Sequence, residues 1–366
     1  MSDAPPTFRF KIEEAPPILL QSDHLPRTDA NSPVLTHAGH TIAFMSHYVP
    51  IGHTYRRSSD AGLHFTSPPE RVTLVDDPDS TVGKWIQSVW RAPDGTYYGW
   101  YHAEEVGMCP TRLFVPHIGA LVSHDRGRTW RCIGAVLRAG NREIDCGYRN
   151  GFLAGGYGDF CVVPDRQHRY FYIHLSSYVA TETAQGIAVA RCAVRDRDHP
   201  VGKIELWHNR GWVAADGLLP SPIWPVARGW RHVDPDSFWG PAIHYNRALD
   251  VWVMLLNRTR NGTGDIRQEG VYVSFNERLD EPLGWSTPQC LISGGVWYPE
   301  VVGSGPEDGD AQAGSPARLF MSGFSAWNIR FHRAVAGEPP SHRVVVRNED
   351  WVRLFGPEAP GRLGIG

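Results

Sequence analysis

Residues 123–130 have the sequence Ser-His-Asp-Arg-Gly-Arg-Thr-Trp and join two apolar stretches, residues 118–122 and 132–137. The side chains of Ser123 and Asp125 can hydrogen-bond to the amides of a turn, and Gly127 tolerates a positive φ. Trp130 is placed to cover the base of a hairpin. The segment therefore predicts two β-strands joined by a tight turn.

This segment resembles the Asp-box, Ser-x-Asp-x-Gly-x-Thr-Trp, of sialidase-type β-propellers, where the box lies between the third and fourth strands of a blade. A weaker copy occupies residues 58–65, and a degenerate one starts at residues 274–276 and continues to Trp285 and Ser286. The resemblance implies a propeller blade. It says little about chemistry, because a fold by itself does not fix a function.

The composition fits many short strands joined by turns. The 366 residues include 38 Gly, 29 Pro and 14 Trp, and the formal net charge is -3. Such a chain can bury a sizeable core. The near-neutral charge gives no reason to expect a nucleic acid or a membrane as partner.

The N-terminus shows no basic segment followed by an apolar one, which favours a cytoplasmic product that is not exported. The six cysteines show neither a CxxC pair nor zinc-like spacing. We expect them to be reduced and mostly buried, at positions Cys109, Cys132, Cys146, Cys161, Cys192 and Cys290.

Five repeats of a strand meander follow one another, and in each repeat the first two strands are the most apolar. The sequence thus predicts an all-β chain in which residues 1–366 form a single five-bladed β-propeller of four-stranded antiparallel blades. A terminal strand, at residues 7–12 or 344–346, would close the ring. A β-sandwich with a second β domain is the alternative. The expected blades are residues 29–75, 80–140, 155–215, 234–292 and 296–350.

Blade topology predicts which face carries the functional residues. The short turns lie on the face of the boxes, and the opposite rim carries long loops such as 103–117 and 138–158, where ligand-binding residues usually lie. Carboxylates occur at the strand ends on this rim, and paired carboxylates are what glycosidic bond cleavage requires. The candidate catalytic residues are Asp29, Glu104, Asp159, Asp236 and Glu300.

The same strand ends carry aromatic residues that can stack on a sugar ring, His and Asn side chains that can hydrogen-bond to hydroxyls, and arginines that can hold a carboxylate. Each of these also has a purely structural explanation, such as an ion pair or a turn. No metal site is predicted, although the histidines leave a bound cation near the propeller axis open. The candidate substrate-binding residues are Asn31, His47, His102, Arg149, His174, Trp239, Asn257, Arg258, Trp297 and Tyr298.

Acids at the starts of first strands in a five-bladed propeller resemble glycoside hydrolase family 43 and its relatives, families 32, 62 and 117. In family 43 the acids that open blades one, two and three are an Asp base, an Asp that tunes pKa and a Glu acid. Asp29 corresponds to the base. Blade two offers Lys84, Trp85 and Gln87 in place of an acid, and blade three offers Asp159 in place of Glu.

The resemblance and the residues together predict a glycoside hydrolase that acts on an oligosaccharide or polysaccharide end by two-carboxylate acid/base catalysis. Sialidase activity is disfavoured, because five blades are expected and a Phe-Arg-Ile-Pro motif is absent. A propeller polysaccharide lyase that acts on a uronate-containing glycan, or a non-catalytic carbohydrate-binding propeller, is the alternative. The lyase would use His102, His174, Tyr148, Arg149 and Arg258. The oligomeric state stays open.

Overall fold

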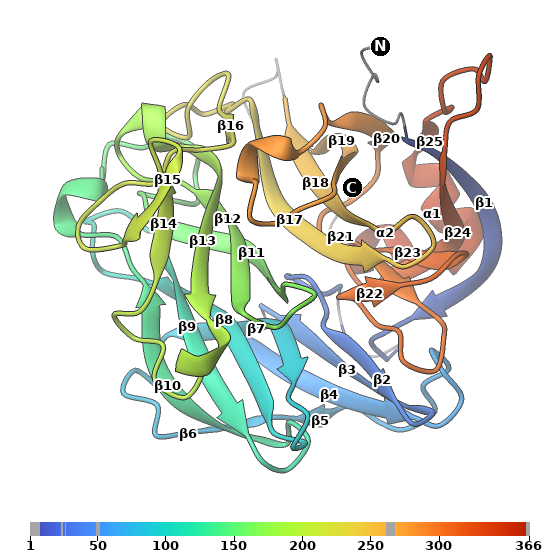
Figure 1. The fold of residues 1–366 in the computed structure, drawn as a ribbon, viewed down its shortest axis with the longest axis horizontal. Coiled ribbons are helices and arrows are strands. Elements are labelled where there is room, and N and C mark those ends of the chain that lie inside the picture. Colours follow the sequence, from blue (N-terminus) through green and yellow to red (C-terminus); the bar gives the residue numbers. More distant parts are fainter. Residues whose placement is uncertain (1–7, 23–24, 26, 49–51, 261–267, 364–366) are drawn as a thin grey trace.

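The chain is mainly β, as predicted. The computed structural model describes residues 8–22, 25, 27–48, 52–260 and 268–363; residue 7, the first of the predicted strand 7–12, lies outside this part. Strands make up 50% of the described residues and helices 7%, in a propeller-like arrangement. In Figure 1 the sheets follow one another in sequence order, from the blue β2 to the red β24. Within the described residues, no helix has the length and apolar character needed to cross a membrane.

The strands form five hydrogen-bonded sheets, three of which come from the first two thirds of the chain. One of these contains β2 (Val34–His37), β3 (His40–His47), β4 (His53–Ser59) and β5 (Glu70–Arg71). The next contains β6 (Thr73–Val75), β7 (Gly83–Arg91), β8 (Tyr97–Glu105), β9 (Val115–Ser123) and β10 (Thr129–Leu137). The third contains β11 (Tyr157–Pro164), β12 (Tyr170–Ser177), β13 (Gly186–Ala193), β14 (Glu205–His208), β15 (Gly211–Ala214) and β16 (Trp224–Pro225).

The remaining two sheets combine the C-terminal third with the N-terminal strand. The larger contains β17 (Ser237–Asn246), β18 (Val251–Thr259), β19 (Gln268–Asn276), β20 (Gln289–Gly294), β22 (Gln312–Ala313) and β25 (Val344–Val346). The smaller contains β1 (Phe8–Leu19), β21 (Pro299–Gly303), β23 (Ala317–Met321) and β24 (Phe324–Arg333). The helices are α1 (Asn348–Phe355), α2 (Ala359–Leu363) and the 3-10 turns Asn141–Glu143, Glu182–Ala184, Val194–Asp196 and Pro282–Gly284.

The prediction of five four-stranded antiparallel blades is wrong in its details. The propeller-like arrangement has four blades rather than five. The hydrogen-bonded sheets hold between four and six strands each. Three of the additional strands, β6, β22 and β25, pair in parallel with β10, β17 and β20. They come from connecting segments that dock on a sheet edge, where they satisfy backbone groups that would otherwise face water.

The N-terminal strand completes a sheet from the other end of the chain. β1 pairs antiparallel with β24 from Phe8 opposite Arg333 to Leu19 opposite Phe324. In Figure 1 the dark blue β1 accordingly runs beside the red β24. The other terminal candidate, residues 344–346, joins a different sheet as β25 and pairs with β20. The two ends of the chain are therefore held together by strand pairing.

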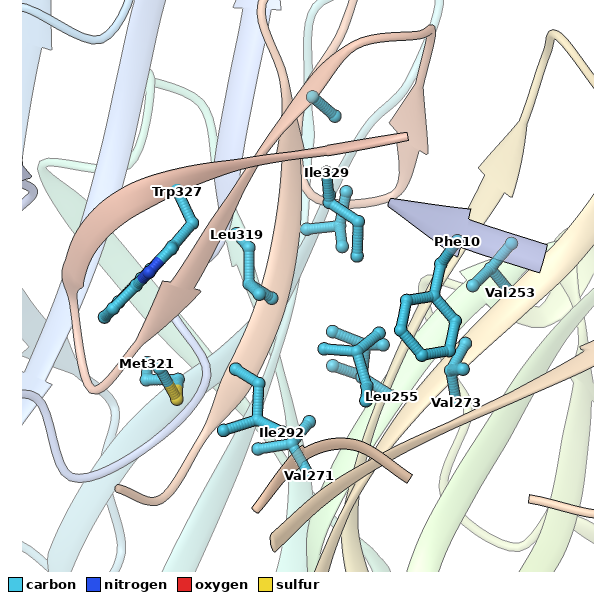
Figure 2. Packing of buried hydrophobic residues seen from close by; sticks show 14 of the residues in the cluster. Phe10, Val253, Leu255, Val271, Val273, Ile292, Leu319, Met321, Trp327 and Ile329 are labelled. Carbon is cyan, nitrogen blue, oxygen red and sulfur yellow. The ribbon is translucent and has the colours of Figure 1, made fainter. Parts of the chain in front are cut away.

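The largest apolar cluster lies between this sheet and the neighbouring one. Phe10 of β1 packs in the same cluster as Val253 and Val273, which lie on β18 and β19. Figure 2 shows these three side chains close together, with Leu319 and Ile329 from β23 and β24 beside them. Apolar burial is the main stabilising contribution to folding, so the N-terminal strand is part of the core.

The predicted hairpin at residues 123–130 is confirmed, because β9 and β10 pair antiparallel on either side of it. The Ser123 hydroxyl accepts a hydrogen bond from the Gly127 amide at 2.9 Å, and the Asp125 carboxylate accepts one from the Thr129 amide at 2.9 Å. Gly127 has a φ of 77°. Trp130 is fully buried and donates through Nε1 to the Gly127 carbonyl at 3.0 Å. The relation of the three box-like segments as repeats stays a prediction.

We expect Trp130→Ala to destabilise the protein by about 3–5 kcal/mol, the usual cost of removing a buried aromatic side chain. Urea unfolding followed by circular dichroism measures this change. His124→Ala, on the exposed side of the same turn, is the control and should leave the unfolding midpoint unchanged. A loss below about 1 kcal/mol for Trp130→Ala would show that the hairpin does not depend on this ring.

Candidate active site

A cavity of about 640 Å³ lies where several strands begin or end. It is within the range of about 300–1,000 Å³ that is usual for small-ligand sites. Its wall is largely aromatic, and its charged groups are three carboxylic acids and three arginines. The aromatic residues are Tyr48, Phe114, Phe152, Tyr178, Trp230, Trp239, Trp297 and Tyr298. The charged residues are Asp29, Glu104, Asp159, Arg27, Arg112 and Arg362.

Three of the five predicted carboxylic acids meet in this cavity. Asp29 precedes β2, Glu104 lies near the end of β8, and Asp159 lies near the start of β11. Two of these acids lie on strands of different sheets, and Asp29 lies in the segment that leads into a third sheet. Burial and the negative charge of Glu104 raise the pKa of Asp29 to about 7, and Asp159 contributes in the same direction. Like charges that share one cavity do not all ionise at the usual pH.

A β-bulge directs Asp159 into the cavity. The register between β11 and β12 shifts between Gly158 and Cys161, and Asp159 has a φ of 39°. This conformation is uncommon for a residue other than glycine, and such strain is concentrated at functional sites. The Tyr178 hydroxyl donates to the Asp159 carboxylate at 2.5 Å. Burial raises the pKa of Asp159, while the charge on His102 and the Tyr178 hydrogen bond oppose that rise.

His102 connects two of the acids. Its Nδ1 accepts a hydrogen bond from the Asp159 amide at 3.2 Å, so the proton of the neutral ring lies on Nε2, which is 3.3 Å from the Glu104 carboxylate. Burial lowers the pKa of His102, but the Glu104 hydrogen bond and the nearby carboxylates outweigh it, and the net shift is upward. A Cβ at Gly158 would lie 2.5 Å from the imidazole. Only glycine therefore leaves room for this ring.

The other two predicted catalytic acids do not line the cavity. Arg258 donates to the Asp236 carboxylate at 2.7 Å, so this acid is engaged in an ion pair. Glu300 is 3% exposed and accepts a hydrogen bond from the Ser32 amide at 2.8 Å. It borders a separate, very small cavity together with Asn31. The expectation that all five acids surround one opening is therefore met for three of them.

The predicted substrate-binding residues divide in the same way. Trp239, Trp297 and Tyr298 line the cavity, and His102 lies behind its acids. The other candidates have structural partners or lie elsewhere. Asn31 and Asn257 donate to backbone carbonyls of residues 239–241, and His47 contacts the Arg27 carbonyl. His174 is buried against Trp285, and Arg258 pairs with Asp236. Arg149 is exposed and lies away from the cavity.

Sequence reasoning missed several residues of the cavity wall. Arg27 lies between predicted elements, and its guanidinium stacks on Trp297 at 5.1 Å from the ring centroid. Arg362 comes from α2, 203 positions after Asp159. Tyr178 directly follows β12, one residue beyond the end of the strand. A strand-end position was the available signal for Tyr178, whereas nothing local marked the two arginines.

The structure corrects the prediction that all cysteines are reduced. Cys109 and Cys146 form a disulfide, and the other four are free. The bond joins the loop before β9 to the loop before β11, and both loops contribute cavity residues, Arg112 and Phe152 among them. Spacing in the sequence gave no sign of this pair, because 37 positions separate the two cysteines.

No cluster of three or more His, Cys, Asp or Glu side chains suited to a metal ion occurs among residues 8–22, 25, 27–48, 52–260 and 268–363. Two acids of the cavity have side-chain partners instead, because Glu104 contacts His102 and Asp159 accepts a hydrogen bond from Tyr178.

Solved structures share this fold. A Bifidobacterium bifidum s17 protein assigned as an exo-β-1,3-galactanase is 11% identical over 92% of this chain and 97% of its own, with a TM-score of 0.53. A family 117 glycoside hydrolase from Zobellia galactanivorans is 13% identical over 88% and 90%, with a TM-score of 0.52. No protein-family model and no curated protein sequence matches the chain. The likeness therefore establishes a fold of the propeller glycoside hydrolase type.

We expect the variant Cys109→Ser/Cys146→Ser to be less stable by up to about 4 kcal/mol, because the disulfide closes a long loop in the unfolded chain. Thermal unfolding with and without a reductant measures the effect. The control is Cys290→Ser, which removes a free cysteine and should make no difference to the response to reductant. Equal stability of the double variant and the wild type would contradict the prediction.

The raised pKa of Asp29 also predicts a pH dependence of stability. Between about pH 4 and pH 7 folded Asp29 holds a proton that the unfolded chain has released, so its contribution to stability falls as the pH rises through this window. Asp29→Asn should therefore gain stability relative to the wild type on going from pH 4 to pH 8, by up to about 4 kcal/mol. Urea unfolding at both pH values tests this. Asp216→Asn, at an exposed position, is the control, and a gain that does not depend on pH would contradict the assignment.

Proposed function

We propose that the protein is a glycoside hydrolase that cleaves a sugar unit from the end of an oligosaccharide or polysaccharide in this cavity. The observation that carries the proposal is the meeting of Asp29, Glu104 and Asp159 in one aromatic-walled cavity. Acid/base hydrolysis needs one carboxylic acid to protonate the leaving oxygen and one carboxylate to activate water or attack the anomeric carbon. In this proposal residues 1–366 act as one domain.

The surroundings of the acids indicate which one donates a proton and which one acts as base or nucleophile. No hydrogen bond joins the Asp29 carboxyl to another residue of the described part of the chain, and its pKa of about 7 keeps much of it protonated at neutral pH. Asp29 is therefore our proton donor. Glu104 receives the His102 Nε2 hydrogen bond, which stabilises a carboxylate, and it is our base or nucleophile. The negative charge of Asp159 helps to raise the pKa of Asp29. This assignment differs from the family resemblance, in which the position of Asp29 is the base.

The lyase alternative finds less support. The candidate residues Arg149, His174 and Arg258 do not line the cavity, and the Tyr148 hydroxyl donates to the carbonyls of Tyr178 and Val179. A non-catalytic sugar-binding propeller would need the aromatic wall but no acid that keeps its proton near neutral pH.

The test compares Asp29→Asn and Glu104→Gln on two kinds of substrate, 4-nitrophenyl glycosides and oligosaccharides of the same sugar, after a screen of neutral and acidic sugars. Loss of the donor should slow oligosaccharide hydrolysis about 10²–10⁴-fold. The rate of hydrolysis of the 4-nitrophenyl glycoside should fall much less, because its leaving group needs little protonation. Loss of Glu104 should abolish turnover of both.

Asp236→Asn is the matched control and should keep its activity, since Asp236 lies outside the cavity. Equal losses on both substrates for Asp29→Asn would contradict its role as donor. Undiminished turnover in Asp29→Asn and Glu104→Gln alike would overturn hydrolysis at this cavity. Products that absorb as unsaturated uronates would identify a lyase instead.

A further inference from the structure

The arginines of the cavity differ in what holds them. Arg362 donates to the carbonyls of Ser22 and Leu25 and stacks on Phe324 at 5.1 Å from the ring centroid, which is a structural role. Arg27 and Arg112 form no ion pair with any residue in the described part of the chain. An arginine in a cavity with unused donors can bind a ligand anion.

Arg27 has two side-chain contacts with described residues. Its guanidinium stacks on Trp297, and one Nη1 hydrogen donates to the Leu363 carbonyl at 2.5 Å. An arginine side chain has five N–H donors in a fixed fork. Trp297 packs edge-to-face against Trp239 at 5.5 Å between ring centroids, and both rings line the cavity. The guanidinium is therefore held beside the surface on which a sugar ring would stack.

Arg112 lies on a loop that is fixed on both sides. Three residues before it Cys109 forms the disulfide with Cys146, and two residues after it the Phe114 amide donates to the Phe152 carbonyl at 2.7 Å. The side chain of Arg112 is exposed and makes no hydrogen bond or ion pair with a described residue. Its backbone position is therefore fixed while its charge stays available at the cavity.

Neighbouring acids on the same rim are already paired. Glu105 lies 2.8 Å from both His117 and Arg138, and Asp145 lies 3.5 Å from Arg231. Arg27 lowers the pKa of Asp29, but this opposes a larger rise from burial and Glu104. Glu105 and Asp145 thus have other partners, and no ion pair joins Arg27 or Arg112 to a described acid.

We propose that the cavity takes a sugar unit with an anionic substituent, a carboxylate or a sulfate, which Arg27 and Arg112 bind while the ring stacks on the tryptophans. This proposal deepens the proposed hydrolase function and rests on it for the fate of the bound sugar. Guanidinium groups bind both anions bidentately, which a neutral hydroxyl does not reproduce. The substrate class is therefore an acidic glycan, either a uronate polymer or a sulfated one.

The test is a binding titration followed by tryptophan fluorescence, since three tryptophans line the cavity. The probes are galacturonate tetrasaccharides with their carboxyl-reduced counterparts, and sulfated galactan tetrasaccharides with their desulfated counterparts. We expect one charged probe to bind about 10–100-fold more tightly than its neutral partner, the range for a hydrogen-bonded charged pair. The preference should weaken as salt is added. The probe that shows it distinguishes a uronate from a sulfate.

Arg27→Gln and Arg112→Gln should each remove most of this preference, because the affinity for the charged probe falls much more than the affinity for its neutral partner. Arg142→Gln, an exposed arginine outside the cavity, is the matched control and should behave as the wild type. Equal binding of each charged probe and its neutral partner would overturn the inference, even if neutral sugars are hydrolysed. Charged probes that bind through these arginines but are never cleaved would support it and count against the hydrolase instead.

Discussion

Three carboxyl groups held in one cavity form the constraint on which the site depends. Asp29 precedes β2, Glu104 lies on β8 and Asp159 lies on β11, and the charges of Glu104 and Asp159 raise the pKa of Asp29. Hydrogen bonds stabilise two of them, from His102 to Glu104 and from Tyr178 to Asp159. The third, Asp29, keeps its proton to about pH 7. Burial also raises the pKa of Asp159, although the charge on His102 and the Tyr178 hydrogen bond oppose that rise.

The backbone around the cavity shows how such a site is maintained. Strands β7, β11 and β17 each carry a register shift in the pairing with the next strand. The shift in β11 lies between Gly158 and Cys161 and includes Asp159. The Ser176 hydroxyl donates to the Asp159 carbonyl at 3.2 Å and accepts from the Gly240 amide at 2.9 Å. Two bulges are therefore fixed to each other across sheets. Bulges commonly redirect a side chain next to an active site.

Two long-range connections hold the wall of the cavity in place. At the chain ends, β1 pairs with β24, and α2 brings Arg362 to the cavity. The Arg362 carbonyl accepts a hydrogen bond from the Arg27 amide at 3.2 Å. The Cys109–Cys146 disulfide joins two loops on the other part of the wall. Both connections restrict segments that carry arginines and aromatic rings. A binding surface made of loops gains affinity when its loops are ordered before the ligand arrives.

The amino-acid sequence was enough to predict the mainly β fold and the hairpin at residues 123–130. It also predicted that Asp29, Glu104 and Asp159 belong to one site near strand ends. Apolar strands and turn residues are local signals, which is why these features could be read from the sequence. The position of Asp236 and Glu300 outside the cavity became clear from the three-dimensional structure alone. Asp236 forms an ion pair with Arg258, and Glu300 accepts a hydrogen bond from Ser32. Both contacts depend on how the chain folds, which local sequence does not show. The disulfide and the arginines of the wall were likewise beyond the sequence. Docked connecting strands, which changed the sheets from the predicted blades, depend on open sheet edges that local sequence does not encode.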